Sequence, residues 1–323
     1  MEIFSKNKIY DFMSQSKHFI TASIVLILVS YALLFTKGLS YGIDFSGGTL
    51  VQVKYDTKAP IEKIREQLSQ DELFANAQIT EFGTPDEIVI RFATTTDSVG
   101  QDLGDKIRTL LVGTGNFDIR KVDIVGPKVG GELRAKGLTS TILCILGILM
   151  YIAFRFEWRF AVASIIALVH DVSITLGAII LFDIDMSLDV LAAILTLIGY
   201  SINDTIIVFD RIREEVKTTK NFDLFDVINL SVSKTLSRTT LTSLTVLLVV
   251  LTLFLFGGEI IHGFSFTLLF GVIIGTYSSI FVAAPLLKWF GFSIESYKNK
   301  QALKEKNRIE KEKMRSQYEK GTV

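Results

Sequence analysis

An amide and a carboxyl stand inside one of the most apolar stretches of the chain. Asn203 and Asp204 interrupt a run of hydrophobic residues over 187–209, which ends directly before a charged segment. A helix rises about 1.5 Å per residue, so Asp204 would lie about 9 Å inside the charged end of this helix. A carboxylate at that depth in a membrane costs on the order of 2.5–3.5 kcal/mol on insertion scales. The position therefore predicts a functional site.

Other polar residues are expected at similar depth. His170 and Asp171 fall near the middle of the apolar stretch 160–182, and Arg238 begins the stretch 239–256 with a side chain long enough to reach inward by about a turn. Helical spacing predicts that Asp204 shares one protein-facing side of its helix with small and polar residues. These residues are Ala193, Thr196, Tyr200 and Asn203.

Two interpretations of this polar set are compared: simple attachment between helices, and proton handling. Interhelical polar contacts contribute about 0.6 kcal/mol on average, which is less than the insertion cost of a carboxylate. Burial favours the neutral acid and a nearby guanidinium favours the carboxylate, so the distance of Arg238 from Asp204 would set the proton affinity. The membrane potential adds about 2.3 kcal/mol per charge per 100 mV. A proton relay of Asp204, Arg238, Asp171, His170 and Asn203 is the resulting hypothesis.

The composition defines the class of protein. Hydrophobic residues make up 49% of the 323 residues, and several apolar runs reach 17 residues or more. These runs indicate an integral membrane protein. The formal net charge of zero gives no indication of a nucleic-acid partner. The single cysteine, Cys144, cannot form an internal disulfide and has no metal-type spacing, so no metal site is expected.

The hydrophobic pattern predicts a polytopic α-helical membrane protein with six transmembrane helices. The connections near 155–159 and 211–238 and the region after the last segment carry Lys and Arg, whereas 183–189 and 257–262 carry none. The positive-inside rule then places both termini in the cytoplasm. A cleaved signal peptide is the alternative for the first segment, but no clear cleavage site follows it. The expected segments are 19–35, 138–154, 160–182, 187–209, 239–256 and 264–289.

Between the first two segments the pattern changes to short strands and amphipathic helices. Their order is β-α-β-β-α-β, which predicts a ferredoxin-like α+β periplasmic domain. Its glycine-rich start at 42–48 lacks the lysine and spacing of a phosphate-binding loop, and tight turns explain it better. The expected division is 1–37 for the N-terminus and first helix, 38–135 for this domain, 136–290 for the other helices and 291–323 for a charged cytoplasmic tail.

Two further stretches suggest contacts. Gly271 and Gly275 form a small-xxx-small pattern that predicts close helix packing, either within the chain or with a partner. The residues 222–232 show helical apolar spacing and suggest an amphipathic helix on the cytoplasmic face. The basic tail would touch anionic lipid or a partner, or would simply be solvated.

Several motifs together resemble the SecF family of bacterial protein export. They are Gly42–Thr49, Gly126–Gly130, His170–Asp171, Tyr200–Glu215, Ser237–Thr239 and Gly275–Ile280. The resemblance implies membership of the resistance-nodulation-division superfamily in the cell inner membrane, in a form separate from SecD. It implies SecD, the SecYEG channel and unfolded preprotein as partners. It also implies use of the proton motive force late in translocation, with protons as coupling ion, no other cofactor and no enzyme activity. In that family the residues matching Asp204 and Arg238 are implicated in proton conduction.

Two other functions remain as alternatives. Asp171 and Asp204 could form the dyad of an intramembrane aspartyl protease, because two acids that share a proton are a sound catalytic arrangement. The chain could also be a purely structural membrane subunit, in which case the polar residues would matter only through assembly. Whether His170 carries protons or only supports Asp171 is left open by the sequence.

Overall fold

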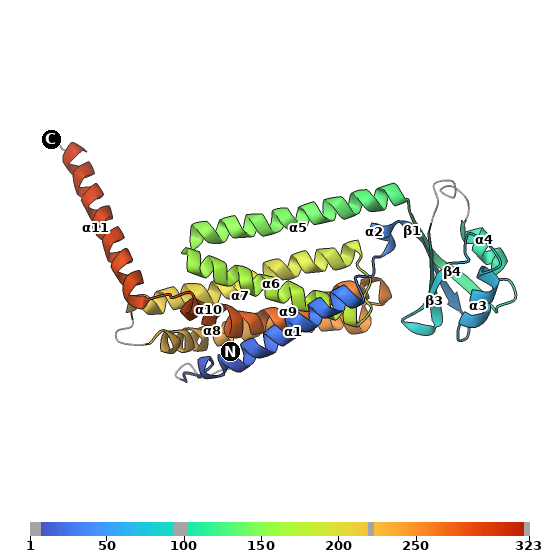
Figure 1. The fold of residues 1–323 in the computed structure, drawn as a ribbon, viewed down its shortest axis with the longest axis horizontal. Coiled ribbons are helices and arrows are strands. Elements are labelled where there is room, and N and C mark those ends of the chain that lie inside the picture. Colours follow the sequence, from blue (N-terminus) through green and yellow to red (C-terminus); the bar gives the residue numbers. More distant parts are fainter. Residues whose placement is uncertain (1–7, 94–102, 219–222, 320–323) are drawn as a thin grey trace.

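The computed structural model describes residues 8–93, 103–218 and 223–319. It consists of a bundle of long helices with a small α+β domain at one end and one projecting helix at the other (Figure 1). We call the end beside the α+β domain the outer end of the bundle and the opposite end the inner end. The projecting helix is α11, Ile294–Glu319, and it contains the charged tail.

Six helices are long and apolar enough to cross a membrane, as the sequence predicts, and the count refers to the described residues. The last of them is interrupted by a π-helical turn, η4 (Ser279–Ala283), between α9 and α10. The membrane helices are α1 (Ser16–Thr36), α5 (Pro127–Arg155), α6 (Trp158–Leu181), α7 (Leu188–Thr218), α8 (Leu224–Phe256) and α9 (His262–Ser278) with α10 (Ala284–Trp289).

Three of these helices extend beyond the apolar stretches. α7 continues to Thr218, and α8 begins at Leu224 with its N-cap Asp223 accepting a hydrogen bond from the backbone N–H of Phe225. The amphipathic stretch 222–232 therefore lies mainly in the first turns of α8. α5 begins at Pro127, which suits the first turn of a helix. Residues 127–135, assigned from the sequence to the external domain, thus belong to a membrane helix.

The α+β domain has the ferredoxin-like arrangement that the sequence predicts. Its four strands form one antiparallel sheet in the order β2-β3-β1-β4, and both helices pack on one face, where Ile64 and Ile107 are fully buried. The elements are β1 (Gly48–Tyr55), α3 (Ile61–Leu68), β2 (Gln78–Phe82), β3 (Thr84–Phe92), α4 (Leu103–Leu110) and β4 (Phe117–Val125).

The glycine-rich stretch before β1 forms a close turn against the start of α5. After the short helix α2 (Ile43–Ser46), Gly47 has a φ of 72°, and a Cβ there would lie 2.7 Å from Cα of Pro127. Gly130 of α5 approaches the same turn, because its Cβ would lie 2.7 Å from the backbone nitrogen of Gly47. Only glycine fits such a close backbone approach.

Several contacts attach the α+β domain to the loop between α6 and α7. The backbone N–H of Gly42 donates to the Met186 carbonyl at 2.9 Å, and Asp44 accepts from the N–H of Leu188 at 3.0 Å. Arg91 of β3 forms an ion pair with Asp185. The open face of the sheet and this loop line a cavity of about 900 Å³.

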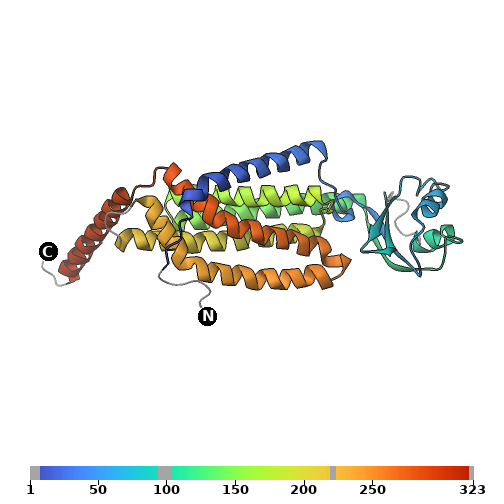
Figure 2. The same cartoon turned by 90° about the horizontal axis from the view of Figure 1, so that it is seen from below.

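In the bundle, α6, α7 and α9 are the most buried membrane helices, whereas α1, α5 and α8 are largely exposed. Figure 2 shows α9 running obliquely between α1 and α8. α7 packs against α6, α8 and α9, and α1 packs against α6. The polar side chains of α6 and α7 therefore meet in the most protected part of the bundle.

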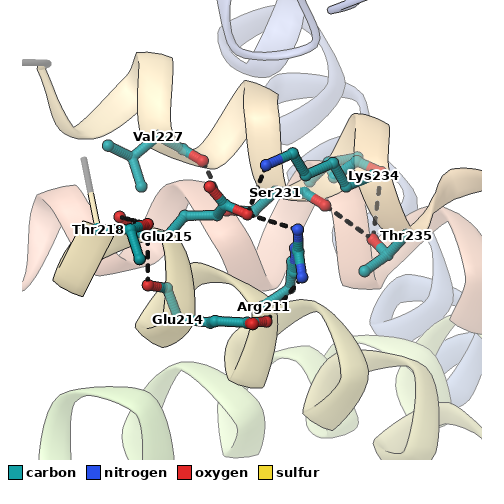
Figure 3. A network of polar contacts seen from close by, with 9 residues as sticks. Arg211, Glu214, Glu215, Thr218, Val227, Ser231, Lys234 and Thr235 are labelled. Carbon is teal, nitrogen blue, oxygen red and sulfur yellow. Dashed lines mark hydrogen bonds and ion pairs between the residues drawn. The ribbon is translucent and has the colours of Figure 1, made fainter. Parts of the chain in front are cut away.

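At the inner end a buried carboxylate joins α7 to α8. Figure 3 shows Glu215 between the side chains of Arg211 and Lys234. The Nζ of Lys234 lies 2.7 Å from Oε1 of Glu215, and Nη2 of Arg211 lies 2.6 Å from the same oxygen. We call these three residues the inner clamp. It fixes the ends of the two helices where both extend past their apolar stretches.

Candidate functional site in the helix bundle

Asp171 of α6 is fully buried and is bonded by side chains from two other helices. Its Oδ2 accepts hydrogen bonds from Ser278 of α9, at 2.8 Å, and from Ser201 of α7. Its Oδ1 lies 2.7 Å from Nδ1 of the neighbouring His170. The carboxyl is thus held from three sides, which compensates for its removal from water.

His170 extends this cluster to the first membrane helix. Its Nε2 lies 2.9 Å from the hydroxyl of Ser23 on α1, and Ser23 in turn hydrogen-bonds the hydroxyl of Tyr277 on α9. Tyr277 donates to the backbone carbonyl of Phe19 at 2.7 Å. A continuous chain of hydrogen bonds therefore connects Asp171 to the backbone of α1.

Sequence reasoning did not identify Ser23 and Tyr277 as site residues. A usable signal exists for Ser23, because Ser23 and Ser30 lie seven residues apart on one face of the otherwise apolar α1. Both serines are buried. At Gly177 of α6 an added Cβ would lie 2.0 Å from the hydroxyl of Ser30, so α1 and α6 approach very closely. This approach brings Ser23 within reach of His170.

Asp204 of α7 is also fully buried, but it has fewer partners. Its Oδ2 accepts a hydrogen bond of 3.3 Å from Ser243 of α8, and the hydroxyl of Thr276 on α9 donates to Ser243 at 2.8 Å. Its Oδ1 is buried without a hydrogen-bond partner among the described residues. A buried oxygen without a donor is costly, and such groups often have a functional reason.

Asp171 and Asp204 belong to separate hydrogen-bonded groups. The first is bonded by His170, Ser201 and Ser278, and the second by Ser243. No hydrogen bond between the two carboxyls is found in the described part of the chain. A protease dyad requires two carboxyls that share one proton, so this geometry gives that alternative no support.

Arg238 lies on the exposed side of α8. Among the described residues, Arg238 forms no ion pair with Asp204 within 4 Å. It lies five residues before Ser243, the residue of α8 that is hydrogen-bonded to Asp204. Five residues correspond to about 7.5 Å along a helix. The guanidinium is therefore near the level of Asp204 but separate from it in this arrangement.

Asn203 does not join the buried group, and neither does Thr196. Both side chains are exposed, together with Ala192 and Gly199, at intervals of four, three and four residues along α7. The prediction that Asn203 and Thr196 share the protected face with Asp204 is therefore wrong. Successive residues of a helix point about 100° apart, and the protected face of α7 follows Ala193, Leu197, Ser201 and Asp204 instead. We call Ala192, Thr196, Gly199 and Asn203 the exposed α7 stripe.

Gly271 and Gly275 of the last membrane helix pack within the chain. A Cβ on Gly271 would lie 2.6 Å from Cδ2 of Leu197, and a Cβ on Gly275 would lie 3.1 Å from Cβ of Ser201. α9 thus approaches α7 directly beside the serine that donates to Asp171. The π-helical turn η4 begins one residue after Ser278, and such turns occur frequently at functional sites.

Comparison with known proteins defines the family. A family model described as protein export membrane protein SecD/SecF, C-terminal, matches residues 106–293, and one described as the SecD/SecF GG motif matches residues 32–59. The protein translocase subunit SecF of Helicobacter pylori is 49% identical over all 323 residues and over its own full length. That of Calditerrivibrio nitroreducens is 45% identical over 89% of this chain and 96% of its own. The chain therefore belongs to the SecD/SecF family of protein export membrane proteins, on its SecF side.

Solved structures of SecDF share this arrangement. The crystal structure of SecDF from Thermus thermophilus, described as a translocon-associated membrane protein, matches 90% of this chain with a TM-score of 0.82 at 33% identity. SecDF in a form described as super-membrane-facing matches 94% with a TM-score of 0.64 at 32% identity. In both cases the chain spans 40% of the SecDF chain, so those proteins contain a large part that this chain lacks.

Proposed function

We propose that this chain couples proton movement across the membrane to a late step of protein export, as the partner of a SecD subunit. The observation that carries the proposal is Asp204, an acid buried at membrane depth whose Oδ1 has no hydrogen-bond partner among the described residues. An ionisable group of this kind in a membrane helix marks a site of ion or proton movement by default. Protons are then the coupling ion, and the chain needs no other cofactor and no catalytic reaction of its own.

We assign the part of the proton path beyond Asp204 to the SecD subunit. Thr196 and Asn203 of the exposed α7 stripe and Arg238 of α8 are polar groups at membrane depth that the chain itself leaves uncovered. Polar groups at such depth face protein or water rather than lipid. The SecDF relatives carry the additional part within one chain. A separate SecD subunit seated on this side would cover the stripe and bring Arg238 into a protein interior.

The proposed setting is the cell inner membrane, with both termini in the cytoplasm and the α+β domain on the far side. The Lys and Arg residues of the loops support this orientation. The inner clamp and α11 then face the cytoplasm. The SecYEG channel and the unfolded preprotein are the other proposed partners, in keeping with the translocase names of the relatives.

Replacing Asp204 tests the proposal. Asp204→Asn keeps the size of the side chain but removes the group that can bind and release a proton. We expect proton flux to fall to background in vesicles that contain this chain with SecD, and the force-dependent part of reporter export to be lost. Assembly with SecD should remain normal.

Asp189→Asn is the matched control, because Asp189 is an exposed acid at the other end of the same helix. It should leave flux and export unchanged. Normal flux in Asp204→Asn would remove Asp204 from the mechanism. Loss of assembly in Asp204→Asn would instead support a purely structural role.

A further inference from the structure

The hydrogen-bonded chain from Asp171 to α1 has a fixed direction. The carbonyl oxygen of Phe19 can only accept, so the single hydroxyl hydrogen of Tyr277 points toward it. The Tyr277 oxygen must then accept from Ser23. Ser23 has used its only hydrogen in that bond, so it accepts from Nε2 of His170. The arrangement therefore requires a hydrogen on Nε2.

This requirement fixes the number of protons on the His170–Asp171 pair. Nδ1 of His170 and Oδ1 of Asp171 lie 2.7 Å apart, so one hydrogen must lie between them. It belongs either to an imidazolium beside a carboxylate or to a carboxylic acid beside a neutral imidazole. The pair is neutral overall in both cases. It carries one proton more than a neutral histidine beside an ionised aspartate.

We propose that the His170–Asp171 pair is a one-proton binding site whose loading is transmitted through Ser23 and Tyr277 to the contact between α9 and α1. When the pair releases its proton to water that enters the bundle, its charge changes from zero to −1. The bond between the two side chains then persists only with the remaining imidazole hydrogen on Nδ1. Nε2 becomes an acceptor, Ser23 turns to donate to it, and Tyr277 turns to donate to Ser23.

The consequence lies at the end of the chain. Once Tyr277 donates to Ser23, it no longer donates to the carbonyl of Phe19, so one of the two hydrogen bonds by which Tyr277 joins α9 to α1 is broken. The loaded state therefore has one more hydrogen bond in this chain than the unloaded state. Loss of one proton at the buried pair thus loosens two helices from each other.

The groups that face the pair allow this behaviour. Tyr277 on α9 is the titratable side chain in contact with it, and α1, α7 and α9 add the hydroxyls of Ser23, Ser201 and Ser278. No Lys or Arg contacts the pair within the described residues. The proposal deepens the proposed function, and its role in export rests on that function, but the protonation of the pair can be measured by itself.

The experiment reads the tautomer of His170 by nitrogen NMR. The protein, assembled with SecD in lipid, contains 15N-labelled histidine, and His18→Gln and His262→Gln leave His170 as its sole histidine. At low pH we expect a hydrogen on Nε2. On raising the pH we expect the neutral ring to carry its hydrogen on Nδ1.

Tyr277→Phe tests the transmission. Without the tyrosine hydroxyl the loaded state loses its advantage of one hydrogen bond, so the pair should release its proton at a pH lower by about half to one unit. Tyr31→Phe is the control, since the Tyr31 hydroxyl contacts Ser173 at 3.4 Å, away from the pair. It should leave the midpoint unchanged.

Two results would overturn the proposal. If the His170 ring carried its only hydrogen on Nδ1 at every pH with Tyr277 intact, the pair would not bind the extra proton. If the midpoint were unchanged in Tyr277→Phe, the loading of the pair would not be transmitted to Tyr277. Neither result depends on whether Asp204→Asn loses proton flux. Failure of this proposal is therefore distinguishable from failure of the proposed function.

Discussion

At the scale of single residues, the two buried acids differ in how well their environments satisfy them. Asp171 is bonded by three side chains from three helices, whereas Asp204 has one hydrogen bond of 3.3 Å and one oxygen without a partner. As long as the His170–Asp171 pair keeps its proton, these bonds hold the surroundings of Asp171 in one arrangement. An incompletely bonded acid gains more from a partner that arrives by movement. The geometry thus assigns the two acids different roles, with Asp204 as the one open to a new partner.

Gly177 offers a residue-scale test of the contact between α1 and α6. In Gly177→Ala the new Cβ would meet the hydroxyl of Ser30 at 2.0 Å and the Cα of Ser30 at 2.9 Å, so the backbone of α1 must move. Overpacking of this kind typically costs about 1–3 kcal/mol. We expect a lower melting temperature for the purified protein and a loss of the Ser23–His170 contact.

The control is Gly147→Ala on α5, where nothing lies within 4 Å of the added Cβ. Alanine favours a helix over glycine by about 0.5–1 kcal/mol, so the melting temperature of this control should stay the same or rise. Equal melting temperatures in wild type and Gly177→Ala would contradict the close approach.

The sequence predicts the positions of these residues along their helices better than the directions of their side chains. The positions of His170, Asp171 and Asp204 along their helices follow from counting residues, because each helix has a charged end. Which way a side chain points depends on the neighbouring helices. α6 and α9 are apolar on nearly every side, so their pattern does not distinguish a protein-facing side from a lipid-facing side. Ser23 was missed for the same reason, because α1 is also apolar on nearly every side. Asn203 was misplaced because the protected side of α7 depends on the helices packed around it.

At the scale of elements, the inner clamp joins α7 to α8 through one buried carboxylate. Glu215 is buried and receives both Arg211 and Lys234, while the two cations keep 29% and 38% of their side chains exposed. Because the cations remain partly in water, the clamp is weaker than a fully buried ion pair. It nevertheless joins two helices that carry Asp204 and Ser243.

Replacing the carboxylate of the clamp should loosen the inner ends of both helices. Glu215→Gln leaves Arg211 and Lys234 without their common partner, and we expect a loss of about 1–2 kcal/mol, below the 3–5 kcal/mol of a fully buried pair. Hydrogen exchange of the backbone amides near Arg211 and Lys234 should become faster.

Glu214→Gln serves for comparison. Glu214 pairs with Arg211 within α7 and its side chain is 64% exposed, so its loss should cost less than about 0.5 kcal/mol. If both variants exchanged at the same rate as the wild type, the clamp would have no role in stability.

The bounds of the helices show which features the sequence pattern predicts and which it does not. The six apolar stretches and the β-α-β-β-α-β order could be predicted, since both follow from periodicity. The extension of α7 to Thr218 could not, and neither could the continuity of the predicted helix over 222–232 with the membrane helix α8, because both regions are polar on the side facing solvent. They remain helical because each helix packs against the other and is fixed by the clamp.

At the scale of the whole molecule, the α+β domain is attached to the bundle by a small number of polar contacts. Arg91 and Asp185 form an ion pair that is only partly exposed, and Met186 close by forms backbone hydrogen bonds with Gly42 and Ser40. The two SecDF structures match this chain at nearly equal identity but with TM-scores of 0.82 and 0.64. The relatives therefore hold equivalent parts in different arrangements.

Removing the ion pair should widen the range of domain positions. In Arg91→Gln the backbone bonds near Gly42 remain, so we expect a broader distribution of distances and no detachment. Electron-spin resonance would measure the distribution of distances between two spin labels. The labels are attached to cysteines introduced at Lys63 of α3 and Thr139 of α5, and Cys144 is replaced by serine.

Lys54→Gln is the matched control, because Lys54 pairs with Asp86 and Glu87 inside the same domain. It should leave the distance distribution unchanged. A distribution in Arg91→Gln as narrow as that of the wild type would show that the backbone bonds alone fix the domain.

The length of α7 has a mechanical consequence. Its 31 residues span about 46 Å, well beyond the roughly 30 Å of a bilayer core. Asp204 and Glu215 lie on this one uninterrupted rod, about 17 Å apart along its axis. If a change at Asp204 tilted α7, the inner end of this helix would move sideways. The inner clamp would then move α8 with it. Binding or release of a proton at Asp204 would thus move the part of α7 that lies outside the bilayer.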